Sequence, residues 1–122
     1  MEEAYKVEIV ETNLTLTKKQ RVQLKTNPGT KLDAICPVTI ENIIGYARLK
    51  INNPSVSSAP EYEHFVVVSE NGEMYYTGSQ SFMRNFMDIW DEMVGEKDWG
   101  IEVYKMDSRK YPGKQFMTCK LV

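Results

Sequence analysis

Alternating apolar and polar residues predict short β-strands along most of the chain. Residues 5–11 alternate, with Tyr5, Val7 and Ile9 on one face and Lys6 and Glu8 on the other, which is typical of a strand that buries one face. Residues 12–17 and 20–26 continue the alternation, and we interpret the polar run Lys18-Lys19-Gln20 as a turn between two strands. Asn27-Pro28-Gly29 predicts another turn. The start of the chain is therefore expected to consist of strands and turns.

The middle and the end of the chain carry further strand patterns. Strands are expected over residues 46–51, 64–69, 74–77, 99–106 and 114–121. The dipeptide Asn71-Gly72 is the strongest short-range signal of a β-hairpin. Residues 39–44 lack clean periodicity, and we interpret them as a short helical turn capped by Thr39. Residues 52–61, rich in Asn, Ser and Pro, are expected to form a surface loop.

One helix is well defined, at about residues 79–94. Its apolar positions recur at helical spacing and form a single stripe: Phe82, Phe86, Ile89, Trp90 and Met93. Ser79 is a good N-cap and Gly95 a natural end. Five to seven strands with this helix indicate a mainly β fold, α+β by element count. We expect a single domain over residues 1–122, a small OB-like β-barrel with the helix packed across it.

The charges are segregated along the chain. The net charge of −2 by itself argues against a nucleic-acid partner. However, residues 12–32 and residues 108–122 contain no Asp or Glu, while both segments contain several Lys and Arg. Residues 61–102 hold most of the acids. Because phosphate binding depends on the local potential, one face of the folded chain can be basic despite the acidic total.

Three segments are candidates for contact with nucleic acid. The first, residues 18–25, lies in an acid-free run. The second, residues 46–50, and the third, residues 109–114, combine cations with an aromatic ring. Binding of single strands without sequence preference requires cations along the phosphates and flat rings on which bases stack. In the second segment, Tyr46, Arg48 and Lys50 share one strand face. The residues expected to contact nucleic acid are Lys18, Lys19, Arg21, Lys25, Tyr46, Arg48, Lys50, Tyr76, Arg109, Lys110, Tyr111 and Lys114.

Two points about these tyrosines stay open. Tyr46 has an alternative placement, with its ring on the core and only its hydroxyl exposed. Tyr75 and Tyr76 are adjacent in a strand and point to opposite faces, so one of them is expected to be exposed. The sequence does not decide which.

No enzyme is indicated. The single histidine, His64, begins an apolar strand and is interpreted as a structural or rim residue. The seven glycines are dispersed and form no phosphate-binding motif. Asp88, Asp91 and Glu92 have a spacing that would let them share a cation, but such acids are typical of the solvated face of an amphipathic helix. We expect no catalytic residue, no metal and no cofactor.

The sequence also bears on the compartment. The acidic start of the chain lacks the apolar segment of a secretory signal, and no apolar run approaches the length of a membrane span. Cys36 and Cys119 are isolated from each other and from His64, which is typical of reduced thiols in a core. A cytoplasmic protein without a membrane partner is expected.

Two stretches share a pattern with a known family. Phe65-Val66-Val67-Val68 is followed by a Glu-Asn-Gly turn, Met74-Tyr75-Tyr76 and a helix. Ile101-Glu102-Val103-Tyr104-Lys105 is followed by a basic loop and Gly113-Lys114-Gln115-Phe116-Met117-Thr118. This order of elements, over roughly residues 27–122, resembles phage and mobile-element single-stranded-DNA-binding proteins.

The resemblance implies an OB-fold protein that coats single-stranded DNA during replication or recombination in a bacterial host cell. It also implies replication or recombination proteins as further partners. Many such proteins end in a disordered acidic tail that recruits partners. Here the chain is expected to end inside a strand, at Cys119-Lys120-Leu121-Val122, which puts such a tail in doubt.

An alternative is a phage-encoded inhibitor or accessory module that binds a host protein. In one form of it, the acids mimic DNA. This form requires one continuous acidic surface that includes Asp88, Asp91, Glu92, Glu61 and Glu63. The oligomeric state stays open, and pairing between copies at a barrel edge is one route to a homo-oligomer.

Overall fold

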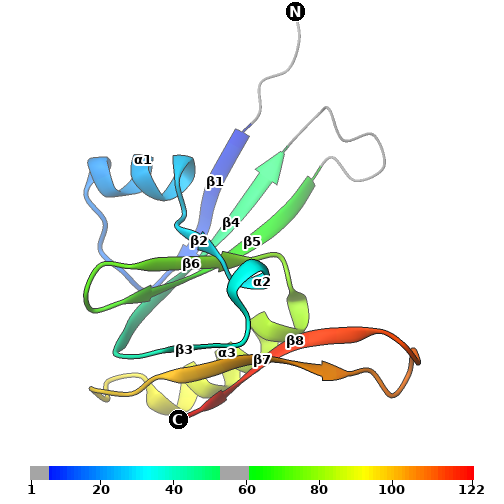
Figure 1. Cartoon of the computed structure of the whole chain (residues 1–122). Coiled ribbons are helices and arrows are strands. Elements are labelled where there is room, and N and C mark those ends of the chain that lie inside the picture. The colour runs from blue at the N-terminus through cyan, green and yellow to red at the C-terminus, as the bar shows by residue number, and fades with distance from the viewer. Residues whose placement is uncertain (1–5, 53–60) are drawn as a thin grey trace, which may run out of the picture.

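Two separate β-sheets and three helices make up the described part of the chain, residues 6–52 and 61–122, in a computed structural model (Figure 1). The larger sheet has the order β1-β4-β5-β6-β2, with β1 (Lys6–Thr12), β4 (Ile43–Asn52), β5 (Glu61–Ser69), β6 (Met74–Thr77) and β2 (Thr30–Lys31). The smaller sheet has the order β3-β7-β8, with β3 (Val38–Ile40), β7 (Ile101–Asp107) and β8 (Gln115–Leu121). The helices are α1 (Lys18–Thr26), α2 (Leu32–Ile35) and α3 (Gln80–Met93).

The mainly β character expected from the sequence is confirmed, but a closed barrel is not. The two sheets remain separate, with five and three strands. The Asn71-Gly72 turn joins β5 to β6, and these strands pair in antiparallel fashion. Gly72 has a φ of 88°, which a residue with a side chain rarely adopts. The hairpin predicted at Asn71-Gly72 is therefore confirmed.

Helix α3 lies close to the expected span. The Ser79 hydroxyl accepts a hydrogen bond from the Phe82 N–H at 3.2 Å and caps the first turn. Phe82 and Phe86 are fully buried, and their rings contact Phe65 of β5 and each other. The apolar stripe of α3 thus forms the centre of the core, as its periodicity predicts.

The prediction of a turn and a strand over residues 18–26 is wrong, because this segment is α1. The Thr17 hydroxyl accepts from the Gln20 N–H at 3.1 Å, and the Gln20 side chain accepts from the Thr17 N–H at 2.9 Å. This capping box satisfies two backbone donors that a helix start leaves open. Leu24 is buried while Val22 is 59% exposed, so their alternation does not mark a strand face. Residues 13–17 also lie outside any strand.

The helical turn expected over residues 39–44 is also absent. The chain instead ends β3 at Ile40, turns, and begins β4 at Ile43. Asn42 adopts a φ of 53°, a left-handed conformation that asparagine tolerates. This turn buries both Ile40 and Ile43, which explains why the segment shows no helical period. The structure adds α2, which the sequence did not predict.

The larger sheet has two faces with separate cores. We call the side that packs on α3 the α3 face and the side that packs on α1 the α1 face. Tyr46 and Phe65 belong to the core of the α3 face, which also contains residues of the smaller sheet. Ala47 and Val66 belong to the core of the α1 face, together with Leu24 of α1. Successive strand residues therefore serve opposite faces.

Candidate nucleic-acid interface

Tyr46, expected to stack a base, is buried on the α3 face and is only 6% exposed. Its ring lies 5.4 Å from the ring of Trp90 and 5.7 Å from that of Phe65. Its hydroxyl donates a hydrogen bond to Glu11 at 2.7 Å. Burial, and then this bond, raise the pKa of Tyr46 to about 12. The alternative placement is therefore correct, and this ring cannot take a base.

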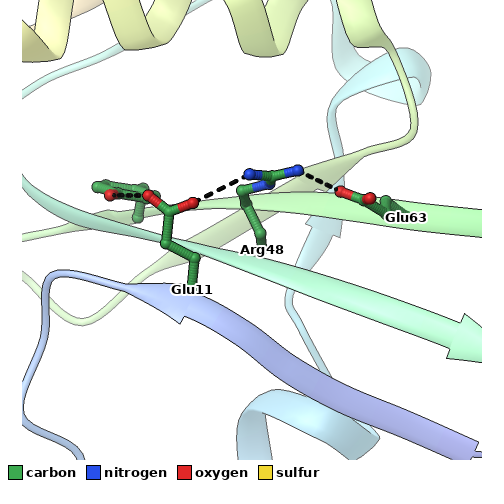
Figure 2. Close-up of polar contacts among 4 residues, drawn as sticks. Glu11, Arg48 and Glu63 are labelled. Carbon is green, nitrogen blue, oxygen red and sulfur yellow. Dashed lines mark hydrogen bonds and ion pairs between the residues drawn. The ribbon is translucent and has the colours of Figure 1, made fainter.

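Arg48 follows on the same strand face and is held between two carboxylates. One terminal nitrogen donates to Glu11 at 3.0 Å and the other to Glu63 at 2.9 Å (Figure 2). The bond that Arg48 donates to Glu63, and then the one that it donates to Glu11, raise the pKa of the Arg48 guanidinium. Bonds from Tyr46 and Arg48 in turn lower the pKa of Glu11. Both terminal nitrogens of the guanidinium are therefore held by carboxylates of the fold.

Lys50 continues this charged face and is paired as well. Its ammonium lies 2.9 Å from a Glu61 carboxylate oxygen. Glu61 and Glu63 are therefore each paired with a cation. They do not extend the continuous acidic surface that the DNA-mimic alternative requires. A phosphate approaching Arg48 or Lys50 would have to compete with these carboxylates.

The α1 face carries a row of three rings, which we call the aromatic row: Tyr62, His64 and Tyr76. Tyr62 and His64 are two positions apart on β5, and their ring centres are 5.3 Å apart. Tyr76 lies on β6, with its ring centre 5.1 Å from that of His64. All three side chains are half-buried. The row therefore offers ring surface beside the hydrophobic core without being enclosed by it.

A groove of about 500 Å³ runs beside the aromatic row. Its wall on the sheet side consists of Val7, Leu49, Ile51, His64 and Tyr76. The end of α1 and the turn after it form the other side, with Lys25, Thr26 and Pro28. The groove thus has an apolar wall with two half-buried rings and a cation, Lys25, on its other side. Such a lining suits a flat, partly charged ligand.

Helix α1, which lines this groove through Lys25 and Thr26, carries further cations toward its start. Lys18, Arg21 and Lys25 recur at spacings of three and four residues and so lie along one side of the helix. These side chains and Lys19 are exposed, and none forms an ion pair with a described residue. Their charges are therefore available to an incoming anion.

The charges that act on His64 come from β2 and α2. Burial is the main cause that lowers the pKa of His64, and the charge of Lys31 lowers it further. The carboxylate of Asp33 opposes this, and it also accepts a hydrogen bond from the Thr77 hydroxyl at 2.8 Å. At neutral pH the imidazole is uncharged, so it is an aromatic surface and not a cation.

The third expected segment forms the tip of the β7–β8 hairpin. Tyr111 is 59% exposed, and the Lys110 ammonium lies 5.6 Å from its ring centre. Arg109, Lys110 and Lys114 are exposed too. In Figure 1 this tip and α1 lie on opposite sides of the molecule. The three basic segments expected from the sequence therefore do not meet in one surface.

Both members of the Tyr75–Tyr76 pair are half-buried, on opposite faces. The Tyr75 hydroxyl donates to Glu73, and this bond and burial raise the pKa of Tyr75 to about 12. Tyr76 belongs to the aromatic row. Sequence reasoning missed Tyr62 and His64, although their spacing of two residues within a strand already places them on one face.

Other chemistry is sparse in the residues that the structure describes. Among residues 6–52 and 61–122, no group of three His, Cys, Asp or Glu is placed to hold a metal ion. Within the same ranges, no helix has both the length and the apolar character needed to cross a bilayer. Cys36 and Cys119 are free thiols, and burial raises the pKa of Cys119 to about 12.

Comparison of the chain with protein-family models, curated proteins and solved structures gives no match.

Proposed function

We propose that the chain binds single-stranded DNA without sequence preference, through the aromatic row and the cations of α1. One observation carries this proposal. The rings of His64 and Tyr76 line the same groove as Lys25, which belongs to a helix without acids. Stacking surfaces and phosphate-binding charges thus lie side by side, as sequence-independent binding of single strands requires. A role in replication or recombination follows from this activity and is proposed with it.

The two parts of the site have different tasks. Bases stack on the rings of the aromatic row, and each stacked base contributes about 1–3 kcal/mol. Phosphates lie along Lys18, Arg21 and Lys25, and each neutralised phosphate releases counterions. Because neither contact reads a base edge, the affinity depends little on base sequence.

A single strand suits this groove better than a duplex. The rings of His64 and Tyr76 line the groove beside the end of α1, and all three rings of the aromatic row are half-buried. A base must leave its stack and its partner to lie on them. A flexible single strand does this at low cost, whereas a duplex must first be opened.

A fluorescence-anisotropy titration with labelled oligo-dT, repeated over a series of NaCl concentrations, tests the proposal. We expect binding at low micromolar protein in low salt. The logarithm of the association constant should fall with the logarithm of salt, with a slope of about −0.7 per phosphate. Absence of binding in low salt would overturn the proposal. An oligo-U arm measures the preference between DNA and RNA.

A pair of matched variants locates the site. The triple variant Lys18→Gln, Lys19→Gln, Arg21→Gln removes three cations from α1. The control Arg109→Gln, Lys110→Gln, Lys114→Gln removes three cations from the hairpin tip. With an oligonucleotide long enough for one copy, only the α1 variant should weaken binding and flatten the salt slope. If the hairpin variant weakens binding as much as the α1 variant, the groove is not the site.

A further inference from the structure

A second groove, of about 390 Å³, lies where α3 ends and β4 begins. Its apolar lining includes Trp90, Met93 and Trp99, with the two tryptophan ring centres 5.9 Å apart. Ile44 and Val94 also line it and are 45% and 58% exposed. These are the two tryptophans of the whole chain. We call this depression the tryptophan groove.

The rim of the tryptophan groove is acidic. Glu70, Glu96 and Asp98 line it, and Lys97 is the one cation among its lining residues. None of the three acids forms an ion pair with a described residue. Exposed apolar surface inside an unpaired acidic rim matches a partner segment that combines an apolar or aromatic side chain with cations.

The β7–β8 hairpin tip, residues 108–114, has that composition. It presents Tyr111 with Arg109, Lys110 and Lys114 and contains no acid. Backbone bonds from Ser108 N–H to Lys114 O at 2.9 Å and from Lys114 N–H to Tyr111 O at 3.0 Å close the tip. A closed tip loses little conformational freedom when it docks.

The tip and the tryptophan groove lie at opposite ends of the smaller sheet. Strand β7 begins at Ile101, just after Trp99, and ends at Asp107, just before the tip (Figure 1). The seven residues of β7 span about 20 Å at roughly 3.3 Å per residue. A tip held at one end of this strand cannot reach a groove at the other end of the same molecule. A tip that fills this groove therefore comes from a second copy.

We propose that the hairpin tip of one copy docks in the tryptophan groove of the next copy. Tyr111 packs against the exposed apolar lining, and Lys110 and Arg109 approach Glu70 and Glu96. A cation near the Trp90 ring adds a cation–π attraction. Because the two surfaces differ, the contact is head-to-tail and repeats into a chain of copies.

This contact uses neither α1 nor the aromatic row, so it leaves the proposed DNA-binding groove open. A tip and a groove of this size bury less surface than a stable dimer requires, and the contact is weak for free molecules. Copies held on one strand experience a high effective concentration of each other, which strengthens the same contact. The cations of the hairpin tip, which lie far from α1, would then serve contact between copies and not contact with DNA.

Sedimentation velocity without DNA tests the proposal independently of DNA binding. In low salt, the weight-average sedimentation coefficient of the wild-type protein should rise with concentration and should return to the monomer value in high salt. A tip variant, Arg109→Glu with Lys110→Glu, and a groove variant, Glu70→Lys with Glu96→Lys, should each stay monomeric. A wild-type protein that remains monomeric up to millimolar concentration in low salt would overturn the proposal.

Mixing the two variants gives the sharper result. The tip variant keeps an intact groove and the groove variant keeps an intact tip, and the two charge-reversed surfaces are also opposite in sign, so the mixture should associate although each variant alone does not. A mixture that stays monomeric contradicts the head-to-tail contact. The α1 variant Lys18→Gln, Lys19→Gln, Arg21→Gln is the control and should associate like the wild type.

Tryptophan fluorescence adds a local readout, since both tryptophans line the groove. Association of the wild type should shift the emission, and adding the groove variant to the tip variant should shift it as well. Unchanged emission on association would place the contact elsewhere. Far-UV circular dichroism of both variants checks that they are folded.

Discussion

The two faces of the larger sheet carry the same kinds of side chain in opposite states. On the α3 face, Tyr46 is buried and Arg48 is paired with two carboxylates. On the α1 face, Tyr76 is half-buried and lines a groove, and Lys25 has no described acid as a partner. A ring or a cation can recognise nucleic acid only when the fold has not already satisfied it. The comparison therefore separates an aromatic–cation cluster that is satisfied within the fold from the one that we propose binds DNA.

The largest expected effect comes from removing a ring of the aromatic row. Tyr76→Leu should weaken oligo-dT binding about tenfold or more, because one stacked base contributes about 1–3 kcal/mol. Its neighbour Tyr75 is half-buried too, but it points to the α3 face. Tyr75→Leu should leave the affinity unchanged in the same anisotropy titration. Equal losses in the two variants would contradict the difference between the faces.

A change on the α3 face should instead affect stability. Arg48→Gln removes both ion pairs and leaves Glu11 and Glu63 without their cation. The free energy of unfolding in urea should fall by about 1–2 kcal/mol, while the affinity for oligo-dT stays the same. Arg21→Gln on α1 is the converse control, with weaker DNA binding and little change in unfolding. A marked loss of DNA affinity in Arg48→Gln would show that this face contacts DNA after all.

Changing a single lysine should have a smaller effect on DNA binding, and that effect should again differ between the two faces. Lys25→Gln should reduce the steepness of the salt dependence of oligo-dT binding by about 0.7, the contribution of one phosphate. The ammonium of Lys50 is held by Glu61, so Lys50→Gln should leave the slope of the salt dependence unchanged. The salt series of anisotropy titrations measures both. The idea fails if Lys50→Gln changes the slope as much as Lys25→Gln.

The smallest effects concern pH. The pKa of His64 is lowered in the folded chain, so its contribution to stability is present above the usual pKa of 6.5 and is lost as pH falls through the folded value. The pKa of Glu11 is also lowered, so its contribution is present above 4.5 and is lost at more acidic pH. Urea unfolding at a series of pH values should show both steps.

Two variants assign these pH steps. His64→Gln should abolish the step that begins below about pH 6.5, the usual range of a histidine. Glu11→Gln should abolish the more acidic step and leave the first one intact. If His64→Gln leaves the first step unchanged, a different group titrates there.

The fold was predictable where each element carries its own local pattern. The stripe of α3 and the Asn-Gly turn between β5 and β6 depend on residues close in sequence. Helix α1 was missed because Val22 and Leu24 alternate like a strand, although the Thr17–Gln20 capping box was present in the sequence. The expected closed barrel is not confirmed, and local patterns could not decide the matter, because closure depends on how distant edge strands pair.

The proposed binding site was only partly predictable. The acid-free run that forms α1 is visible in the composition, so its cluster of cations could be predicted from the sequence although its helix was not. The state of Tyr46 and Arg48 was not predictable. It depends on Glu11, which lies more than thirty residues away in the chain and reaches them only through the pairing of β1 with β4.

By itself, the amino-acid sequence determined the mainly β character, α3, and the separation of basic segments from acidic ones. These properties follow from local periodicity and from composition. Only the tertiary structure decided which cations are paired within the fold, which tyrosines are accessible, and that α1 and the hairpin tip lie on opposite sides. Burial and ion pairing depend on residues that strand pairing brings together from distant parts of the chain. For that reason the two faces of one sheet, although both carry tyrosines and cations, differ in which of these side chains are accessible and unpaired.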